Sequence, residues 1–340
     1  MEQSIRLTGC DVELPVMGLG TWAWGDKSTW GMNSYDRSYN FETIRDAYHA
    51  SVAAGITLLD TAEVYGSGES ERIIGRLLEA DGRLLETDKR LLETDTQNRA
   101  RIVIATKFLP APQKLWLSSA LMAALKASLQ RLKLPWVHLY QIHGPISLRS
   151  HAAMAEALAT AHRAGLVKAV GVSNYSEKEM RAIHAELAKH GIPLATNQIE
   201  YSLLRTMPEA NGLLAACKEL GVVVLAYSPL GQGRLTGKYT AGNPPPGRRN
   251  FSDFPMQEID PIVAELRRMG ERYGKTPAQV ALNWVICKGA VPIPGAKNRA
   301  QAEQNAGALG WRLSGDDLQA LDRVSKSGQR KLMHRFWQHG

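Results

Sequence analysis

The sequence predicts an α/β protein that folds as a (β/α)8 TIM barrel, and three observations support this. The chain has 340 residues, enough for one barrel of about 250 residues with extended loops. Short apolar runs alternate with segments whose apolar residues recur at helical spacing, which is typical of a parallel sheet covered by helices. Eight such runs can be counted, and eight strands favour closure. We therefore expect a single domain over residues 1–340.

The first half of the chain contains four of these strands. Residues 6–14 form a predicted β-hairpin that precedes the barrel, with its turn at Gly9. The predicted strands are residues 16–21, 58–60, 102–107 and 137–143. The predicted helices cover about 40–54, 118–132 and 151–163, and another begins near Ser67, a residue type that favours the N-cap position.

The second half supplies the other four strands and several C-terminal helices. The predicted strands are residues 169–173, 195–200, 222–227 and 291–294. The predicted helices cover about 177–189, 208–220, 261–273, 277–288, 299–309 and 316–325. Residues 231–260 form a loop rich in Gly and Pro, and long loops of this kind are usually functional. We expect the tail, residues 331–337, to fold back toward the pocket.

A repeated segment follows the second strand. Residues 76–82, 83–89 and 90–96 are near-copies of one seven-residue unit with paired leucines. A seven-residue period keeps these leucines on one side of a helix. We therefore predict a helical insertion over residues 76–98, interrupted at Gly82 and outside the active rim. A tandem duplication tolerated at the surface is the simpler interpretation, and a packing or subunit contact is the alternative.

Composition restricts the class of function. The net charge of +8 and the pI near 9.4 favour anionic ligands, but the basic residues are scattered, unlike those of a nucleic-acid-binding arm. We expect a phosphorylated small molecule rather than nucleic acid. No apolar run is long enough to cross a bilayer and no targeting segment is evident. Cys10, Cys217 and Cys287 lack metal-ligand spacing, so we expect no metal site and a cytoplasmic protein with reduced thiols.

Polar residues end three successive predicted strands. Asp60 ends the second strand, Lys107 the third and His143 the fourth. Adjacent parallel strands lie roughly 5 Å apart, so these side chains share one arc of the rim if the strands are neighbours. A buried carboxylate requires a cation, which Lys107 would provide for Asp60. Tyr65 would lie over the group from the loop after the second strand.

These four residues suit the protonation of a carbonyl oxygen. The free pKa of tyrosine is about 10, and a buried Lys107 would lower the pKa of Tyr65 while Asp60 keeps the lysine charged and oriented. His143 could hydrogen-bond the substrate oxygen while hydride reaches the carbon. Taken singly, an Asp at a strand end is more often a helix cap, a Lys is more often a solvated rim charge, and a His is more often a structural histidine. Their joint placement at successive strand ends favours catalysis.

Five motifs then carry a resemblance to the aldo-keto reductase family. They are GLGTW at 18–22, LDTAEVYG at 59–66, TK at 106–107, LYQIH at 139–143 and KAVGVSN at 168–174. The chain resembles the family from residue 18 to about residue 313. The resemblance implies that Tyr65 is the general acid, that Lys107 and Asp60 activate it, and that His143 orients the substrate. It also implies NADP(H) as cofactor.

The sequence contains no Rossmann fingerprint, because GQGRLTG at 231–237 lacks the third glycine and opens a long loop. The barrel must therefore bind its own nucleotide, under the 231–260 loop. The family resemblance implies that Ser173, Asn174 and Gln198 hold the carboxamide and that the Tyr227 ring stacks on the nicotinamide. It implies a pyrophosphate site whose residues, with backbone N–H groups that glycine lets come close, are Ser228, Pro229, Leu230, Gly231, Gln232 and Gly233.

A second anion site is predicted after the eighth strand. The segment from Pro294 through Gly295 to Arg299 opens a helix, whose N–H groups and dipole attract phosphate. With Lys297 and Arg299 there, the 2′-phosphate of NADP is the expected guest, and solvated helix-start charges are the alternative. Resemblance to the family further implies adenine and 2′-phosphate contacts from Gln301, Gln304 and Asn305.

An apolar or aromatic carbonyl substrate is expected because aromatic side chains cluster in the predicted rim loops. These predicted pocket residues are Trp22, Trp24, Trp30, Phe108 and Trp116. The function predicted is NADPH-dependent reduction of an aldehyde or ketone to an alcohol. The alternative is a nucleotide-sensing regulatory subunit that resembles the potassium-channel β subunits. Nucleic-acid binding is a third interpretation and depends on charge alone.

Overall fold

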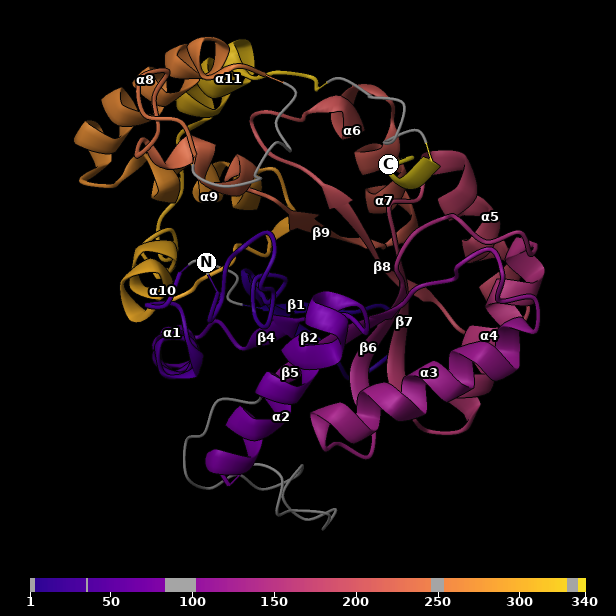
Figure 1. The fold of residues 1–340 in the computed structure, drawn as a ribbon. Helices are drawn as coiled ribbons and strands as arrows, with labels where there is room; N and C mark the ends of the chain where they lie inside the picture. The colour runs from indigo at the N-terminus through magenta and orange to yellow at the C-terminus, as the bar shows by residue number, and fades with distance from the viewer. Residues whose placement is uncertain (1–3, 35, 83–101, 246–253, 329–335) are drawn as a thin grey trace.

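The computed structural model describes residues 4–34, 36–82, 102–245, 254–328 and 336–340 (Figure 1). Eight parallel strands form one sheet in the order β10-β9-β8-β7-β6-β5-β4-β3. Their bounds are β3 Gly18–Gly20, β4 Leu58–Asp60, β5 Val103–Phe108, β6 Val137–Ile142, β7 Val167–Ser173, β8 Leu194–Glu200, β9 Val223–Tyr227 and β10 Val291–Pro292. The (β/α)8 barrel prediction is confirmed.

The barrel closes where the first strand meets the segment after the last. Gly20 pairs in parallel with Gly295, and the Gly20 N–H donates to the carbonyl of Pro294 over 3.0 Å. A Cβ at position 20 would lie 2.6 Å from the carbonyl oxygen of Ile293. Only glycine lets the two backbones come this close.

The predicted N-terminal hairpin is present and closes the amino end of the barrel, opposite the carboxyl ends of the strands. Strands β1 (Ser4–Arg6) and β2 (Glu13–Pro15) pair antiparallel. Leu7, Val12 and Leu14 pack in one buried cluster with barrel-interior residues such as Leu58 and Leu139. Since this cluster fills the amino end, the carboxyl rim is the end left for a site, as is usual in such barrels.

Helices surround the barrel (Figure 1). A second, larger apolar cluster contains buried residues of both the helices and the strands. The helices are α1 Phe41–Ala53, α2 Glu69–Ala80, α3 Leu117–Leu132, α4 His151–Arg163, α5 Glu177–Ala188, α6 Met207–Ala210, α7 Leu213–Leu220, α8 Met256–Tyr273, α9 Pro277–Cys287, α10 Arg299–Ala306 and α11 Gly315–Val324. Two short 3₁₀ helices, η1 (Tyr65–Gly68) and η2 (Gly231–Thr236), lie on the carboxyl rim.

Three predicted element boundaries are wrong for identifiable reasons. Ser67 is not an N-cap: it lies in the η1 turn with φ 56°, and Gly68 caps α2. The single helix predicted for 208–220 is two helices, α6 and α7, because Gly212 adopts φ 83° between them. Helix α8 begins five residues before Pro261, which lies inside it.

Parts of two predicted segments fall outside the described residues. Within the 76–98 insertion, residues 76–80 belong to α2 and residues 83–98 are not described. The tail is described only from Phe336 onward. Across the described ranges, we found no helix with the length and apolar character needed to cross a membrane.

Candidate active site

Neighbouring strands bring the predicted catalytic residues together at the carboxyl rim. Strands β4, β5 and β6 are adjacent in the sheet, and Asp60, Lys107 and His143 each lie within one residue of the carboxyl end of their strand. Asp60 and Lys107 are fully buried, at 2% and 0% exposure. The backbone N–H of His143 donates to the Phe108 carbonyl over 2.8 Å, which extends the pairing of β5 with β6.

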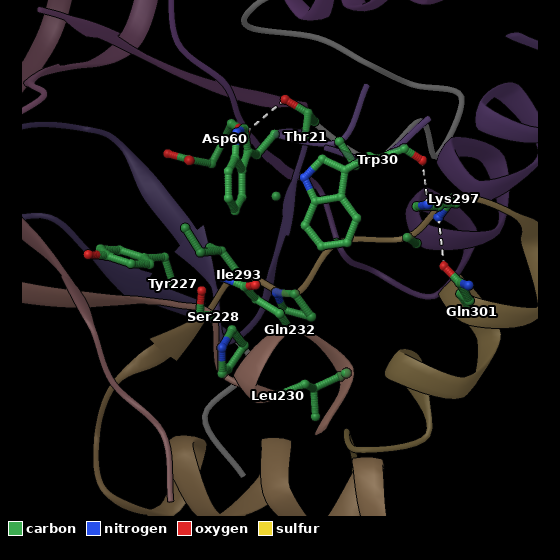
Figure 2. A pocket seen from close by; sticks show the side chains of 18 of the residues that line it. Thr21, Trp30, Asp60, Tyr227, Ser228, Leu230, Gln232, Ile293, Lys297 and Gln301 are labelled. Carbon is green, nitrogen blue, oxygen red and sulfur yellow. Dashed lines mark hydrogen bonds between the residues drawn. The ribbon is translucent and has the colours of Figure 1, made fainter. Parts of the chain in front are cut away.

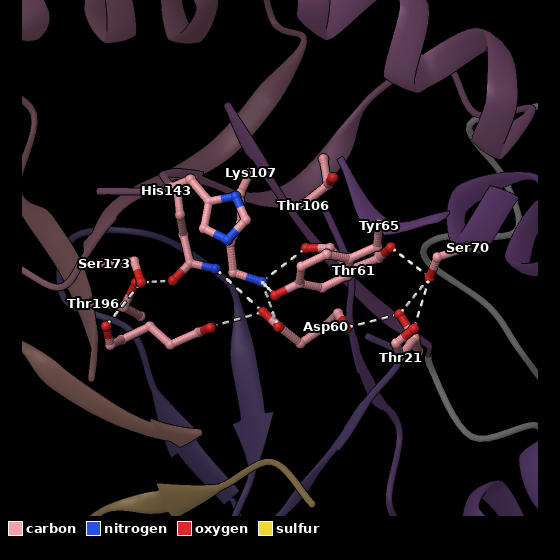
Figure 3. Close-up of polar contacts among 12 residues, drawn as sticks. Thr21, Asp60, Thr61, Tyr65, Ser70, Thr106, Lys107, His143, Ser173 and Thr196 are labelled. Atoms are coloured by element: carbon pink, nitrogen blue, oxygen red, sulfur yellow. Dashed lines mark hydrogen bonds and ion pairs between the residues drawn. The ribbon is translucent and has the colours of Figure 1, made fainter. Parts of the chain in front are cut away.

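The Lys107 ammonium is the centre of this group (Figure 3). Its Nζ lies 2.5 Å from Asp60 Oδ1, 2.8 Å from the Thr61 carbonyl oxygen and 3.3 Å from Tyr65 Oη. An ammonium has three N–H donors, so all three are used. A buried lysine with a paired carboxylate and complete hydrogen bonding keeps its charge.

The second oxygen of the Asp60 carboxylate is also satisfied. Oδ2 accepts hydrogen bonds from Gln198 Nε2 at 2.8 Å and from Gln141 Nε2 at 3.3 Å. Gln198 therefore contacts the Asp60 carboxylate and also lines the pocket. This link between strands β8 and β4 crosses the barrel interior and fixes the orientation of Asp60 toward Lys107.

A hydroxyl network holds the turn that carries Tyr65. Ser70 Oγ lies 2.8 Å from Thr21 Oγ1 and 2.9 Å from Thr61 Oγ1, and it donates to the Thr21 carbonyl over 3.0 Å. These bonds tie the start of α2 to the ends of β3 and β4 (Figure 3). They place the Tyr65 ring over Lys107, with the ammonium 4.9 Å from the ring centroid.

Burial dominates the electrostatics of the site. It raises the pKa of Tyr65, and the attraction of Lys107 only partly offsets this. The predicted lowering of the Tyr65 pKa is therefore wrong in its net direction, although Lys107 acts in the predicted sense. Burial lowers the pKa of Lys107, but Asp60 and Tyr65 reverse this and raise it. Tyr65 stays protonated and Lys107 stays charged at neutral pH.

His143 is a neutral residue in this environment. Burial, and secondarily the charge of Lys107, hold its pKa well below the usual value. Its ring meets Tyr65 edge to face, with centroids 5.6 Å apart, and meets Trp337 at 5.3 Å. Its buried Nδ1 has no hydrogen-bond partner among the described residues. A neutral imidazole carries one N–H, and this group can donate a hydrogen bond to a ligand oxygen.

A large cavity opens beside this group. Its volume is about 1130 Å³, above the range of about 300–1,000 Å³ that holds drug-sized ligands. Figure 2 shows Tyr227 toward one end and Trp30 with Lys297 toward the other. Asp60, Tyr65 and His143 contribute to its lining.

Most of the predicted cofactor residues line this cavity. They are Ser173, Asn174, Gln198, Tyr227, Ser228, Pro229, Leu230, Gln232, Gly233, Gly295, Lys297, Gln301, Gln304 and Asn305. Gly231 and Arg299 are not among the lining residues. Arg299 is exposed and pairs with Glu303 at 3.4 Å on its own helix, so its predicted place in the pocket is wrong.

The residues at the Tyr227 end form a hydrogen-bonded shelf, which we define as Ser173, Asn174 and Tyr227. Tyr227 Oη donates to Asn174 Oδ1 over 2.8 Å, and Asn174 Nδ2 donates to Ser173 Oγ over 3.2 Å. Asn174 has φ 65°, a left-handed conformation uncommon for residues other than glycine. The shelf is thus a preformed structure with one strained member.

Lys297 lies at the other end of the cavity, against two aromatic rings. Its Nζ donates to the Trp30 carbonyl over 3.1 Å and lies 5.2 Å from the Trp30 centroid and 4.6 Å from the Tyr39 centroid (Figure 2). Its backbone N–H donates to Gln301 Oε1 over 2.9 Å. This arrangement connects the loop after β3 to the start of α10.

The predicted aromatic residues divide into two groups. Trp22 and Trp30 line the cavity and meet edge to face at 5.5 Å. Trp24 and Phe108 are 0% exposed and lie in the core, while Trp116 is 85% exposed; none of these three lines the cavity. The prediction is wrong for them, because composition does not reveal the direction in which an aromatic side chain points.

Several lining residues were not among the predicted site residues. Trp337 and Gln338 come from the C-terminal end of the chain, and Tyr39 comes from the loop after β3. In the described part of the predicted tail, residues 336–337, Trp337 reaches the pocket as expected. The Tyr39 hydroxyl is buried without a partner among the described residues. The aromatic character of residues 336–337 was a sequence signal for the tail, but nothing local distinguished Tyr39 from the other aromatic residues in its loop.

Known proteins show the same architecture and sequence pattern. The chain matches the Aldo/keto reductase family over residues 16–326. It is 37% identical to the chloroplastic pyridoxal reductase of Arabidopsis thaliana, over 95% of this chain and 86% of that protein. Among solved structures, a glycerol dehydrogenase from Gluconobacter oxydans has a TM-score of 0.76 at 28% identity, covering 97% of this chain and 98% of the other.

A second solved structure is relevant to the cavity. It is an aldo/keto reductase from Klebsiella pneumoniae in complex with NADP and acetate, with a TM-score of 0.71 at 28% identity, covering 97% of this chain and 98% of the other. The sequence match extends through the strands that carry Asp60, Lys107 and His143 and through the shelf. The chain belongs to the aldo/keto reductase family.

Proposed function

We propose that this protein reduces an aldehyde or ketone to an alcohol with NADPH, and that Tyr65 supplies the proton. The observation that carries the proposal is the position of Lys107, between a buried carboxylate at 2.5 Å and the Tyr65 hydroxyl at 3.3 Å, beside a large cavity. Since such a lysine stabilises the phenolate that forms when Tyr65 gives up its proton, the arrangement suits general acid catalysis.

The residues divide the chemistry among them. Tyr65 retains its proton because burial raises its pKa, and it donates that proton to the substrate oxygen. Lys107 stabilises the resulting phenolate, and Asp60 keeps Lys107 in place. Neutral His143 hydrogen-bonds the same substrate oxygen and fixes the carbonyl orientation. NADPH, when bound, supplies the hydride.

The cavity residues fit a dinucleotide. The shelf of Ser173, Asn174 and Tyr227 offers amide and hydroxyl groups for a carboxamide and a ring face for stacking. Gly233 follows Gln232 in a turn with φ 95°, a conformation that lets backbone approach a pyrophosphate. Gln232 Oε1 and Tyr39 Oη are buried without partners in the described chain, as expected for groups that face a polar ligand.

The nucleotide preference follows from the other end of the cavity. Lys297 and the start of α10 lie there, with Gln301, Gln304 and Asn305 close by along the chain. The amine and the helix N-terminus together favour the 2′-phosphate of NADPH over the ribose hydroxyl of NADH. We assign this preference to Lys297, because Arg299 is outside the cavity lining.

The substrate is proposed to be an apolar or aromatic carbonyl compound. Three tryptophans from two separate parts of the chain, Trp22, Trp30 and Trp337, line the cavity that holds Tyr65 and His143, and aromatic walls favour flat aromatic ligands. The similarity to a pyridoxal reductase supports a heteroaromatic aldehyde as the first compound to test. The three cysteines are free, which supports a reducing compartment such as the cytoplasm.

The proposed function is tested by NADPH oxidation, followed as loss of absorbance, with benzaldehyde, pyridoxal and a short aliphatic aldehyde. We expect steady turnover, fastest with the aromatic aldehydes. A nucleotide-sensing subunit would bind NADPH with at most one slow turnover. Nothing in the described residues favours that alternative, and tight NADPH binding without turnover across the aldehyde panel would support it against our proposal.

A further inference from the structure

The last five residues, which we call the C-terminal tail (residues 336–340), pack against the pocket on several sides. The Trp337 ring meets the His143 ring at 5.3 Å, and Trp337 and Gln338 both line the cavity. His339 Nδ1 lies 2.8 Å from Glu179 Oε1 on α5. The tail is thus attached both at the catalytic group and at the neighbouring helix.

The tail also contacts the strained member of the shelf directly. The carbonyl oxygen of Asn174 accepts the backbone N–H groups of His339 at 3.0 Å and Gly340 at 3.2 Å. Asn174 is buried and has φ 65°. A strained conformation of this kind persists only where the surroundings hold it, and two of the bonds that hold Asn174 come from the tail.

Gln338 connects the tail to the side chains of the shelf. Its Nε2 donates to Tyr227 Oη over 2.7 Å and to Glu200 Oε2 over 3.0 Å. Tyr227 Oη in turn donates to Asn174 Oδ1 over 2.8 Å. Because the hydroxyl has one proton, the bond accepted from Gln338 leaves that proton directed at Asn174.

We propose that Gln338 is a positioning residue for hydride transfer: it fixes the Tyr227 ring and, through the hydroxyl of that ring, the amide of Asn174. The proposal rests on the function proposed above, in which the nicotinamide lies on this shelf. The contacts place no part of Gln338 in the chemistry itself. Gln338 instead affects the position in which the shelf holds the nicotinamide ring, which delivers the hydride.

Loss of these bonds should affect the rate more than the affinity. Net contributions of neutral hydrogen bonds correspond to roughly threefold to tenfold in binding. A misplacement of about 1 Å between reacting atoms can reduce the rate about 100-fold. If the altered shelf still binds NADPH but holds the nicotinamide ring in a shifted position, kcat should therefore fall more than NADPH affinity.

The test uses two substitutions of Gln338 and one control. Gln338→Leu removes both donated bonds at similar volume. Gln338→Glu keeps the shape, but its ionised carboxylate cannot donate to Tyr227 and faces Glu200, which itself lies 3.5 Å from Arg205 Nε. The control is Phe336→Ser in the same tail, at a side chain that is 68% exposed and does not line the cavity.

Three quantities are measured: NADPH affinity by fluorescence titration, the emission maximum of bound NADPH, and kcat with a good aldehyde. The kcat values are taken between about pH 5 and pH 8, because this range extends down toward the usual carboxyl pKa. We expect Gln338→Leu to lower kcat by roughly tenfold or more, to weaken NADPH by less than tenfold and to shift the emission. Gln338→Glu should be as slow near pH 8 and should recover part of its rate as pH falls, because a protonated carboxyl has one O–H that can donate to Tyr227.

The result that overturns the proposal is a Gln338→Leu variant with the kcat, NADPH affinity and emission of the wild type. Equal losses of kcat in Gln338→Glu at all pH values would also contradict it, since that pattern indicates a tail displaced as a whole. If the wild type itself shows no turnover, the proposed function fails. The affinity and emission measurements would then still decide whether Gln338 sets the shelf.

Discussion

The ammonium of Lys107 lies 3.3 Å from the hydroxyl of Tyr65, and a second bond of 2.5 Å connects the same ammonium to Asp60. This geometry makes Tyr65 the only tyrosine among the described residues that hydrogen-bonds a buried lysine. Its hydroxyl can therefore lose a proton and leave a phenolate beside a fixed positive charge.

Changing Tyr65 to Phe should abolish turnover and leave NADPH binding within about threefold of the wild type. The change removes the transferable proton, whereas the proposed nucleotide contacts lie on β7–β9 and α10. The measurements are steady-state kcat and a fluorescence titration with NADPH. Tyr273→Phe is the matched control, because that hydroxyl bonds Asp317 and does not line the cavity. A Tyr65→Phe variant that keeps most of its kcat would exclude Tyr65 as the acid.

Changing Lys107 to Met should be almost as damaging, and it should also destabilise the fold. Asp60 would be left as an unpaired buried carboxylate, and breaking one partner of a buried pair costs about 3–5 kcal/mol. Thermal and urea unfolding measure this loss. The pKa of Tyr65 is raised by burial and lowered only by Lys107, so without Lys107 it rises further.

The rise in the pKa of Tyr65 in Lys107→Met can be tested with a pH–rate profile. Carbonyl reduction requires protonated Tyr65, and the reverse oxidation of the alcohol requires the phenolate. In Lys107→Met, the rise of the oxidation rate with pH should therefore move to higher pH than in the wild type. An oxidation profile that does not move would mean that Lys107 and Tyr65 are not coupled.

His143 should make the fold sensitive to acid. Its folded pKa is well below the usual value, whereas the unfolded chain takes up the proton near pH 6.5. Below about pH 6.5 the unfolded state therefore binds more protons than the folded state. As the pH is lowered from there, the free energy of unfolding decreases, by at most about 1.4 kcal/mol per pH unit for one group.

The change His143→Gln should reduce this acid loss, measured as the midpoint of urea unfolding at several pH values. His184→Gln on α5, outside the cavity, serves as the control. An unchanged acid slope in His143→Gln would mean that other groups cause the acid sensitivity.

Changing Lys297 to Ala should weaken NADPH about tenfold or more and NADH very little. A charge-assisted hydrogen bond contributes about 1.5–3 kcal/mol, and only NADPH has the 2′-phosphate to form it. The control is Arg299→Ala, because Arg299 is exposed and pairs with Glu303 outside the cavity. Titrations at low and high salt should show a narrower difference at high salt. Equal losses for both nucleotides in Lys297→Ala would reject this assignment.

Changing Tyr39 to Phe should stabilise the nucleotide-free protein and reduce the extra stability that NADPH confers. The Tyr39 hydroxyl is buried without a partner in the described chain, and such a group costs about 1–3 kcal/mol. Thermal unfolding with and without NADPH measures both effects. Tyr48→Phe is the contrasting control and should destabilise, because that hydroxyl donates to Asp81 over 2.9 Å. A destabilised Tyr39→Phe variant would show that the hydroxyl already has a partner.

Features set by chain periodicity and strand order could be predicted from the sequence. The eight strands, the hairpin and the meeting of Asp60, Lys107 and His143 follow from apolar runs that end in polar residues. Adjacent strands in a parallel barrel leave these residues little freedom to separate. The net direction of the Tyr65 pKa shift could not be predicted in this way, because it depends on how completely the ring is buried.

Features set by side-chain direction could not be predicted. Trp22 lines the cavity and Trp24 lies in the core, with its Nε1–H donating to the Ala296 carbonyl over 3.0 Å. These two tryptophans are two positions apart in an irregular loop, where no periodic pattern shows which side chain faces the cavity and which faces the core. Lys297 and Arg299 are likewise alike in the sequence but differ in the structure, because Lys297 precedes the N-cap of α10 and Arg299 is the first residue of that helix. Gln338 contacts Tyr227 across 111 positions, a distance that no local pattern covers.

The most direct test of the central claim uses NADPH in which both hydrogens at C4 of the nicotinamide are replaced by deuterium, so that either face delivers a label. Transfer of deuterium to an aromatic aldehyde is read by mass spectrometry of the alcohol. The wild type should give an alcohol that carries one deuterium on the former carbonyl carbon, with one NADPH consumed per alcohol. Tyr65→Phe should bind the labelled nucleotide and form no alcohol. Absence of deuterium from the product of the wild type, or equal labelling by Tyr65→Phe, would contradict NADPH-dependent carbonyl reduction with Tyr65 as the acid.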